Sequence, residues 1–130
     1  DSWLLQRGQV EYNVHCAPCH GLDGRGEGPV HQRAVLLLRG AAAAGTQWVQ
    51  PSNLQAIDEN TRQLTFGPGT YPDGKLFSVI SNGIRNMPAY AHQINVEDRW
   101  AIVAYVRALQ LSQNAPMDQL PAEERAAAER

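Results

Sequence analysis

The sequence has little of what a membrane-spanning or nucleic-acid-binding chain needs. Its longest uncharged stretch, Gly40 to Ile57, contains Gly, Thr, Gln, Pro, Ser and Asn. In hydrocarbon these polar groups would lack hydrogen-bonding partners, so we expect no transmembrane segment. Lysine is nearly absent, since Lys75 is the only lysine among eleven basic residues that are spread along the chain without a basic tract. This pattern excludes a nucleic-acid-binding role.

Length and composition fit one small globular domain. The 130 residues suit a single hydrophobic core, and 43% apolar with 18% charged residues is typical of a globular chain rather than a disordered one. The sequence begins at Asp1 with neither the positively charged nor the apolar region of a secretory signal. We therefore expect any such signal or lipid anchor to have been removed.

Cysteine is also scarce, and its two copies lie in the run Cys16-Ala17-Pro18-Cys19-His20. This is the spacing at which c-type haem is attached. Two thiols held about one helical turn apart can each form a thioether with a vinyl group on one edge of the porphyrin, and the next residue lies beneath the ring. The sequence therefore predicts one covalent haem on Cys16 and Cys19, with His20 as an iron ligand.

Three other interpretations of the cysteine pair fit less well. A redox-active dithiol would follow a strand in an α/β pattern, and the sequence shows neither. A zinc site needs four ligands and would have to recruit two histidines at irregular spacing from His15, His20, His31 and His92. A disulfide across two intervening residues closes a very small loop and stabilises little.

Three segments have the pattern of helices, and none alternates over a useful length as a strand would. The first is Ser2 to His15, and the second is Asp73 to Asn82, which Gly83 ends as a left-handed cap. The third starts after Asn95 as N-cap and runs through Leu109. The attachment motif therefore lies at the C-terminal end of the first helix.

Gly8 is unexpected inside a helix, where glycine costs about 1 kcal/mol relative to alanine. Close backbone contact would explain it. We expect the first and last helices to cross at Gly8, with Tyr12 packed near Ile102 and Tyr105.

Over most of its length the sequence resembles the class I cytochromes c. The matching features are Gly8 and Tyr12 ahead of Cys16, the Cys-x-x-Cys-His motif, the glycine-rich segment to Pro29, Asn86-Met87-Pro88 and the aromatic final helix. The resemblance implies an all-α fold in which helices, including crossed terminal helices, wrap around one covalently bound haem. It also implies maturation outside the cytoplasmic membrane, so we expect a periplasmic protein or one at the outer face of that membrane.

A narrower resemblance, mainly over residues 71 to 110, is to the monohaem cytochrome c subunit of bacterial alternative complex III. The segments that carry it are Asp73-Gly-Lys-Leu-Phe77, Asn82-Gly83, Met87-Pro88-Ala89-Tyr90 and the run from Glu97 to Leu109. It implies a quinol-oxidising complex and a terminal oxygen reductase as redox partners. Membrane association would then come through a complex or a lost N-terminal anchor.

The second axial ligand of the iron has to come from elsewhere in the chain. Met87 lies in a loop fixed by Pro88, whereas Met117 follows the last helix in a polar tail, so Met87 is the expected ligand. A histidine such as His92, or an open site, remains the alternative. The family also places the carbonyl acceptor of the ligating histidine on a proline that matches Pro29, which makes Pro29 a further cofactor-binding residue.

Some segments lie outside the resemblance or allow another interpretation. The stretch between His31 and Trp48 has no match and is either an extra helix or a haem-covering loop. We expect residues 1–112 to form the cytochrome c domain and 113–130 a C-terminal extension that packs on it or trails from it.

No strand precedes the glycines at 21, 24, 26 and 28, so a phosphate cradle is not indicated. The acids Asp23 and Glu27 lack the oxygen spacing of a known calcium loop.

The expected function is single-electron transfer without catalysis. The alternative is a haem-based ligand sensor or the cytochrome domain of a haem enzyme, either of which needs an open sixth site. Haem propionates could bind to Trp48, Tyr71 or Arg85. Because only one lysine is present, we expect a mostly apolar docking surface around residues 17–18 and 87–89 instead of a lysine-rich one.

Overall fold

The computed structural model describes residues 2–38, 48–114 and 122–123. The named helices in these ranges are α1 (Ser2–His15), α2 (Ala17–His20), α3 (Pro29–Leu38), α4 (Asp73–Asn82) and α5 (Val96–Asn114). The described residues form no strand and only two isolated β-bridges, Ile57 with Leu64 and Ile84 with Met87. This part of the chain is all-α, as the sequence predicts.

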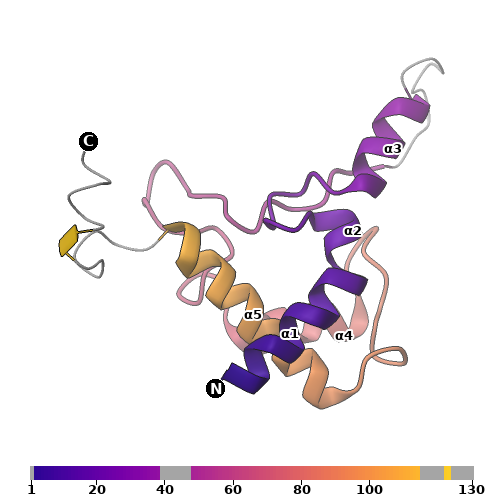
Figure 1. Cartoon of the computed structure of the whole chain (residues 1–130). Coiled ribbons are helices and arrows are strands. Elements are labelled where there is room, and N and C mark those ends of the chain that lie inside the picture. Colours follow the sequence, from indigo (N-terminus) through magenta and orange to yellow (C-terminus); the bar gives the residue numbers. More distant parts are fainter. Residues whose placement is uncertain (1, 39–47, 115–121, 124–130) are drawn as a thin grey trace.

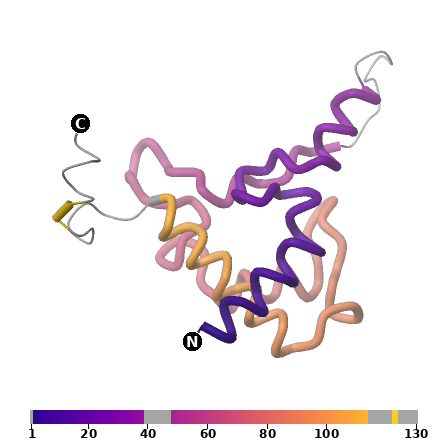
Figure 2. Tube along the Cα trace, viewed as in Figure 1, coloured from indigo at the N-terminus to yellow at the C-terminus, as the bar shows by residue number. Residues whose placement is uncertain are grey.

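Helices α1 and α5 cross and form the main helix pair (Figures 1 and 2). Gly8 lies at the crossing, where a Cβ atom would overlap the carbonyl of Ala101 and come within 2.9 Å of the Tyr105 Cβ. Tyr12, one turn further along α1, is fully buried, and its ring centroid lies 5.3 Å from that of Tyr105. The expected crossing at Gly8 is confirmed.

The hydrophobic core lies between α1, α4 and α5. Its buried members include Tyr12, Leu54, Leu76, Ile80, Ile94, Ile102, Val103 and Val106. Leu5 of α1 is 37% exposed, and the buried residues of this helix are Gly8 and Tyr12, from its middle toward its C-terminal end. This end leads directly into the attachment motif.

The ends of α4 and α5 agree with the sequence signals. α4 ends at Asn82, and Gly83 follows with a φ of 74°. At the start of α5 the side-chain oxygen of Asn95 accepts a hydrogen bond from the backbone N–H of Asp98, at 2.8 Å. Asn95 therefore caps α5, because it satisfies one of the N–H groups that the first turn leaves free.

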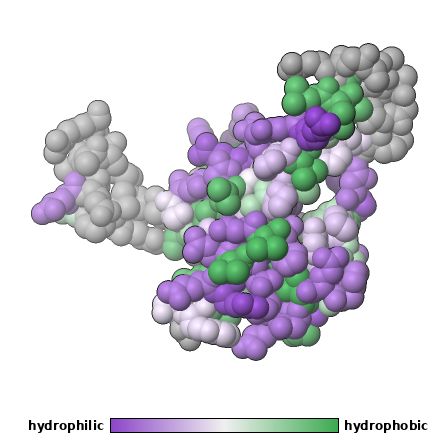
Figure 3. Space-filling view, turned by 45° about the vertical axis from the view of Figure 1, so that its right-hand side comes forward, coloured by the Kyte–Doolittle hydropathy of each residue, from purple (hydrophilic) through white to green (hydrophobic). Residues whose placement is uncertain are grey.

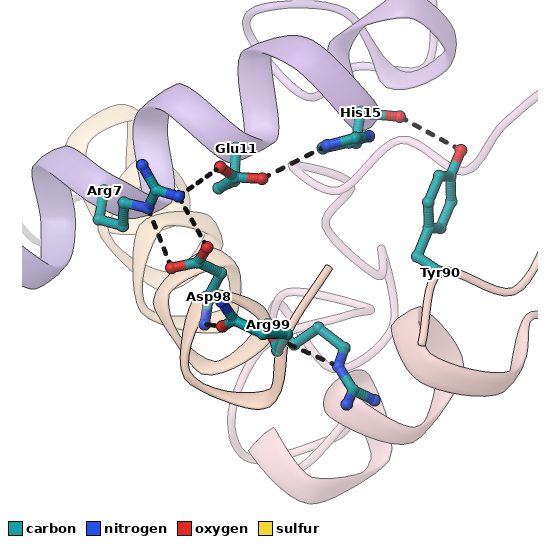
Figure 4. A network of polar contacts seen from close by, with 7 residues as sticks. Arg7, Glu11, His15, Tyr90, Asp98 and Arg99 are labelled. Carbon is teal, nitrogen blue, oxygen red and sulfur yellow. Dashed lines mark hydrogen bonds and ion pairs between the residues drawn. The ribbon is translucent and has the colours of Figure 1, made fainter. Parts of the chain in front are cut away.

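One ion pair joins α1 to α5, and it continues into a polar network along α1 (Figure 4). The Arg7 guanidinium binds the Asp98 carboxylate through Nε at 3.0 Å and Nη2 at 2.9 Å. Glu11 lies between Arg7 and His15. Its Oε1 is 3.1 Å from Nη2 of Arg7, and its Oε2 is 3.3 Å from Nε2 of His15. The Tyr90 hydroxyl donates to the His15 carbonyl at 3.3 Å, which links the end of α1 to the loop before α5.

The sequence allows an extra helix or a haem-covering loop between His31 and Trp48. Residues 39–47 of this stretch lie outside the described residues, and the part before them belongs to helix α3 (Pro29–Leu38). This helix contacts α2 and extends away from the other helices (Figure 1). None of its residues is buried.

The C-terminal part of the chain is described only in part. α5 continues to Asn114, two residues past the expected domain boundary at 112. Met117 and most of the expected extension lie outside the described residues. In the described ranges, no helix combines the length and the apolarity that crossing a bilayer requires.

Candidate haem-binding site

The Cys-x-x-Cys-His motif forms a helical turn that continues α1. The N–H of Cys16 donates to the carbonyl of Tyr12, and the N–H of His20 donates to the carbonyl of Cys16, both at 2.8 Å. The buried hydroxyl of Tyr12 donates to the carbonyl of Gly21 at 2.7 Å. The core of α1 therefore fixes the segment at both ends of the motif.

A cavity of about 500 Å³ adjoins this turn. Cys16, Cys19 and His20 line it, and so does Met87, which lies far away in the sequence. Apolar side chains from α4, α5 and the connecting loops complete the lining, among them Val49, Leu54, Phe66, Leu76, Val79, Ile80, Ile102 and Val106. A mostly apolar cavity of this size with a few convergent polar groups is typical of a cofactor site.

The two thiols lie in an environment that keeps them neutral. Cys16 is buried, and burial raises the pKa of its thiol to about 12. Burial also raises the pKa of the half-buried Cys19. The two sulfurs do not form a disulfide. Redox-active dithiols have a lowered thiol pKa, so this environment does not favour a dithiol centre.

His20 is held in the form that binds metals. Its Nδ1 lies 3.0 Å from the carbonyl oxygen of Ser52. A carbonyl only accepts, so Nδ1 carries the proton and Nε2 is the nitrogen left for a metal. Burial lowers the pKa of the imidazole, and the hydrogen bond to Ser52 opposes this shift only partly. The ring is therefore neutral, as a ligand must be.

The acceptor for His20 differs from the expected one. Pro29 was expected to provide it, but the structure places the carbonyl of Ser52 there. Pro29 is exposed, begins α3 and does not line the cavity that holds His20. Its carbonyl lies in the first turn of α3, where it is directed along the helix. Ser52 lies 32 residues along the chain from His20, and the role of Pro29 toward the bound cofactor stays a prediction.

A short hairpin carries Met87. Ile84 and Met87 exchange backbone hydrogen bonds of 3.1 and 2.8 Å across a two-residue turn in which Arg85 has a φ of 50°. At Gly83 a Cβ atom would lie 2.5 Å from the Met87 carbonyl oxygen, so only glycine lets the hairpin fold back this closely. Met87 is half-buried at the cavity, whereas His92 is exposed and is not part of the lining.

Three residues expected near the haem propionates, Trp48, Tyr71 and Arg85, also line the cavity. The indole N–H of Trp48 donates to Nδ1 of His31 at 3.1 Å. The ring of Tyr71 lies 4.5 Å from the ammonium nitrogen of Lys75, which is a cation–π contact. Their roles toward propionates stay predictions.

Two polar residues of α5 that sequence analysis did not single out hold one wall of the cavity. The Gln110 side chain, 1% exposed, donates to the carbonyls of Leu54 and Phe66 at 2.9 and 3.0 Å. Arg107 donates to the carbonyls of Phe66 and Tyr71. The sequence indicates this role only by the position of Arg107 and Gln110, which interrupt the apolar residues near the end of α5.

Comparison with known proteins places this site in a family. The family model described as "Cytochrome C oxidase, cbb3-type, subunit III" matches residues 4–106, which is most of the chain and contains the motif and Met87. No curated protein sequence matches.

One similar solved structure is a chain of the reducing HAO-like protein complex of Kuenenia stuttgartiensis, with a TM-score of 0.57 and 20% identity. The match covers 84% of this chain and 44% of that chain, so this chain spans less than half of its neighbour. At this identity the likeness shows the fold alone. The cavity, the motif and the family match agree, and the chain belongs to the cytochrome c family described as cbb3-type cytochrome c oxidase, subunit III.

Proposed function

We propose that this domain carries single electrons on one haem c, held covalently by Cys16 and Cys19, with His20 and Met87 as the iron ligands. The observation that supports this most is that all four residues line one cavity. Haem supplies one-electron oxidation and reduction when it is bound. The site offers the donor set that haem c requires, namely two thiols, a neutral imidazole and a thioether.

The chain's own residues determine how such a site behaves. The apolar walls from α4 and α5 exclude water, which favours the less charged form of a buried redox centre. The Ser52 carbonyl fixes the orientation of the His20 ring and its tautomer. With both His20 and Met87 as ligands, the iron would have a raised reduction potential and would be closed to substrates. These features favour a carrier over an enzyme or sensor with an open site.

The redox partners proposed are a quinol-oxidising complex as donor and a terminal oxygen reductase as acceptor, outside the cytoplasmic membrane. The resemblance of residues 71 to 110 to the monohaem cytochrome of alternative complex III supports the donor. The family's description as an oxidase subunit supports delivery to an oxygen reductase.

The test uses the haem-loaded protein and its Cys16→Ser and Cys19→Ser variants. Intact mass should exceed that of the polypeptide by one haem, and each variant should lose most of the haem that stains on a denaturing gel. In the oxidised protein, the weak far-red absorption band of iron–thioether bonding should be present, and carbon monoxide should leave the reduced spectrum unchanged. Full covalent staining of both variants would refute the attachment. Ready carbon monoxide binding would favour the sensor or enzyme alternative.

A further inference from the structure

Helix α3 exposes apolar side chains that nothing in the described part of the chain covers. Val30, Val35, Leu36 and Leu37 are 42, 40, 57 and 60% exposed. The helix extends away from the body (Figure 1), and apolar side chains gather over its described residues in the space-filling view (Figure 3). Exposed leucines clustered on one projecting element are unusual for a water-facing surface and mark an interaction site.

The charge of this region is as distinctive as its apolarity. From Gly28 to Ile57 the sequence contains no Asp or Glu, although the whole chain has thirteen acids and a net charge of -2. The charged residues within this segment are Arg33 and Arg39. The acids nearest in the sequence are Glu27, just before α3, and Asp58. Within the described helix α3, Arg33 is the one charged residue, so the exposed surface of this helix is apolar and cationic. Such a surface complements a partner with an apolar interior and an anionic outer layer.

The base of α3 is fixed to the wall of the haem cavity. His31 stacks on Trp48 with ring centroids 6.1 Å apart, and the Trp48 indole donates to it. The side-chain amide of Gln32 donates to the carbonyl of Glu27 at 3.1 Å. Trp48 also lines the cavity, so this contact joins the base of α3 to the cavity wall.

We propose that α3 docks this domain on a membrane by inserting Leu36, Leu37 and the neighbouring valines into the headgroup region of an anionic phospholipid bilayer. The ten residues of α3 are too few to span a bilayer but suffice for an interfacial segment. Arg33 lies at the level of the lipid phosphates, where each cation near an anionic surface adds to binding. A protein partner would need a groove for this helix, but a bilayer accepts apolar side chains from several sides at once.

The experiment measures sedimentation of the haem-loaded protein with vesicles. One set is phosphatidylcholine alone, and the other is equal parts phosphatidylcholine and phosphatidylglycerol. The protein should bind the mixed vesicles more tightly, and added salt should weaken this binding. The double variant Leu36→Ser/Leu37→Ser should bind at least about tenfold more weakly, since two buried leucine side chains are lost. Arg33→Gln should bind the mixed vesicles a few-fold more weakly.

The matched control is Val10→Ser/Val14→Ser, which removes two valines of α1 that are 53 and 61% exposed. It should bind vesicles as the wild type does. Leu37→Trp should bind more tightly, because tryptophan favours the bilayer interface, and a misfolded protein could not imitate this gain. Absence of wild-type binding to either vesicle, or equal losses in the α1 and α3 variants, would overturn the proposal. A wild-type dimer that the α3 variant abolishes, without vesicle binding, would assign this surface to a second copy instead.

Discussion

Gly8 of α1 lies against the backbone of Ala101 on α5, with no room for a side-chain atom between them. This contact brings Tyr12 into the core, and Tyr12 in turn holds the carbonyl of Gly21 after the attachment motif. The position of the cysteines therefore depends on a helix crossing two turns earlier.

Gly8→Ala should lower the free energy of unfolding by about 1–3 kcal/mol, because the added methyl group forces the two helices apart. Denaturant unfolding of the haem-loaded protein measures this change in the free energy of unfolding. The control is Gly74→Ala in α4, where a Cβ atom meets nothing within 4 Å. It should leave stability unchanged or slightly increased, and an equal loss in both variants would show that the crossing is not the cause.

Met87→Ala should lower the reduction potential and open the iron to carbon monoxide or imidazole, while the haem stays attached. The reason is that loss of a methionine ligand removes the preference for the reduced state and frees one coordination position. Potentiometry and the far-red band report both effects. Met117→Ala is the matched control and should be nearly silent. An unchanged spectrum in Met87→Ala would move the ligand to another residue, such as His92.

Gly83→Ala tests the hairpin that carries Met87 while leaving the thioether in place. The φ of 74° disfavours any side chain, and the new Cβ atom would lie 2.9 Å from the Ala89 nitrogen as well as close to the Met87 carbonyl. We expect a weaker far-red band and partial carbon monoxide binding, intermediate between wild type and Met87→Ala. Gly74→Ala serves again as the control. A spectrum identical to the wild type would show that the hairpin tolerates displacement.

The local elements of this fold could be predicted from the sequence, because their signals are local. The bounds of α1 and α4, the cap at Asn95 and the contact at Gly8 all follow from spacing, capping residues and one glycine with no local explanation. The cavity, in contrast, depends on contacts between distant segments.

The role of the Ser52 carbonyl could not be predicted, because every residue has a backbone carbonyl and the amino-acid type does not show which one accepts a hydrogen bond. The roles of Arg107 and Gln110 depend on loop carbonyls that come near α5 only in the folded chain. Helix α3 remained ambiguous because its polar residues, His31 to Arg33, are consecutive and do not recur at helical spacing.

The ion pair between Arg7 and Asp98 should make stability depend on acid pH. The hydrogen bond from Arg7 lowers the pKa of the Asp98 carboxyl below its ordinary value. Its stabilising contribution is therefore fully present above the unfolded pKa of about 4 and is lost as the pH falls through the lower folded value. Asp98→Asn should unfold more easily at neutral pH and lose stability less steeply below about pH 4.

Thermal unfolding between neutral and acid pH measures this dependence. Glu97→Gln is the control, because Glu97 is an exposed acid in the same first turn of α5. If Asp98→Asn kept the full acid sensitivity of the wild type, other carboxylates would account for it.

Electron transfer to the proposed partner, a terminal oxygen reductase, should depend only weakly on salt. Lys75 and Arg85 are the cationic side chains that line the cavity, and Ala17 is buried, so the expected contact surface narrows to Pro18 and the loop at Pro88. With little charge to screen, the bimolecular rate should change by roughly a few-fold between low and physiological ionic strength. A fall of about two decades or more would show a strongly charged docking face.

The pairing of α1 with α5 also bears on how the chain reaches its folded state. Arg7 and Asp98 are separated by 91 residues, so the crossing closes a loop that spans most of the described chain. Closing such a loop costs conformational entropy, so contacts between α1 and α5 slow folding relative to contacts between neighbouring segments. In the folded chain, the same pairing holds Tyr12, and through Tyr12 the carbonyl of Gly21, in place. Truncation or proteolysis at either terminal helix would therefore also remove the support of the attachment motif.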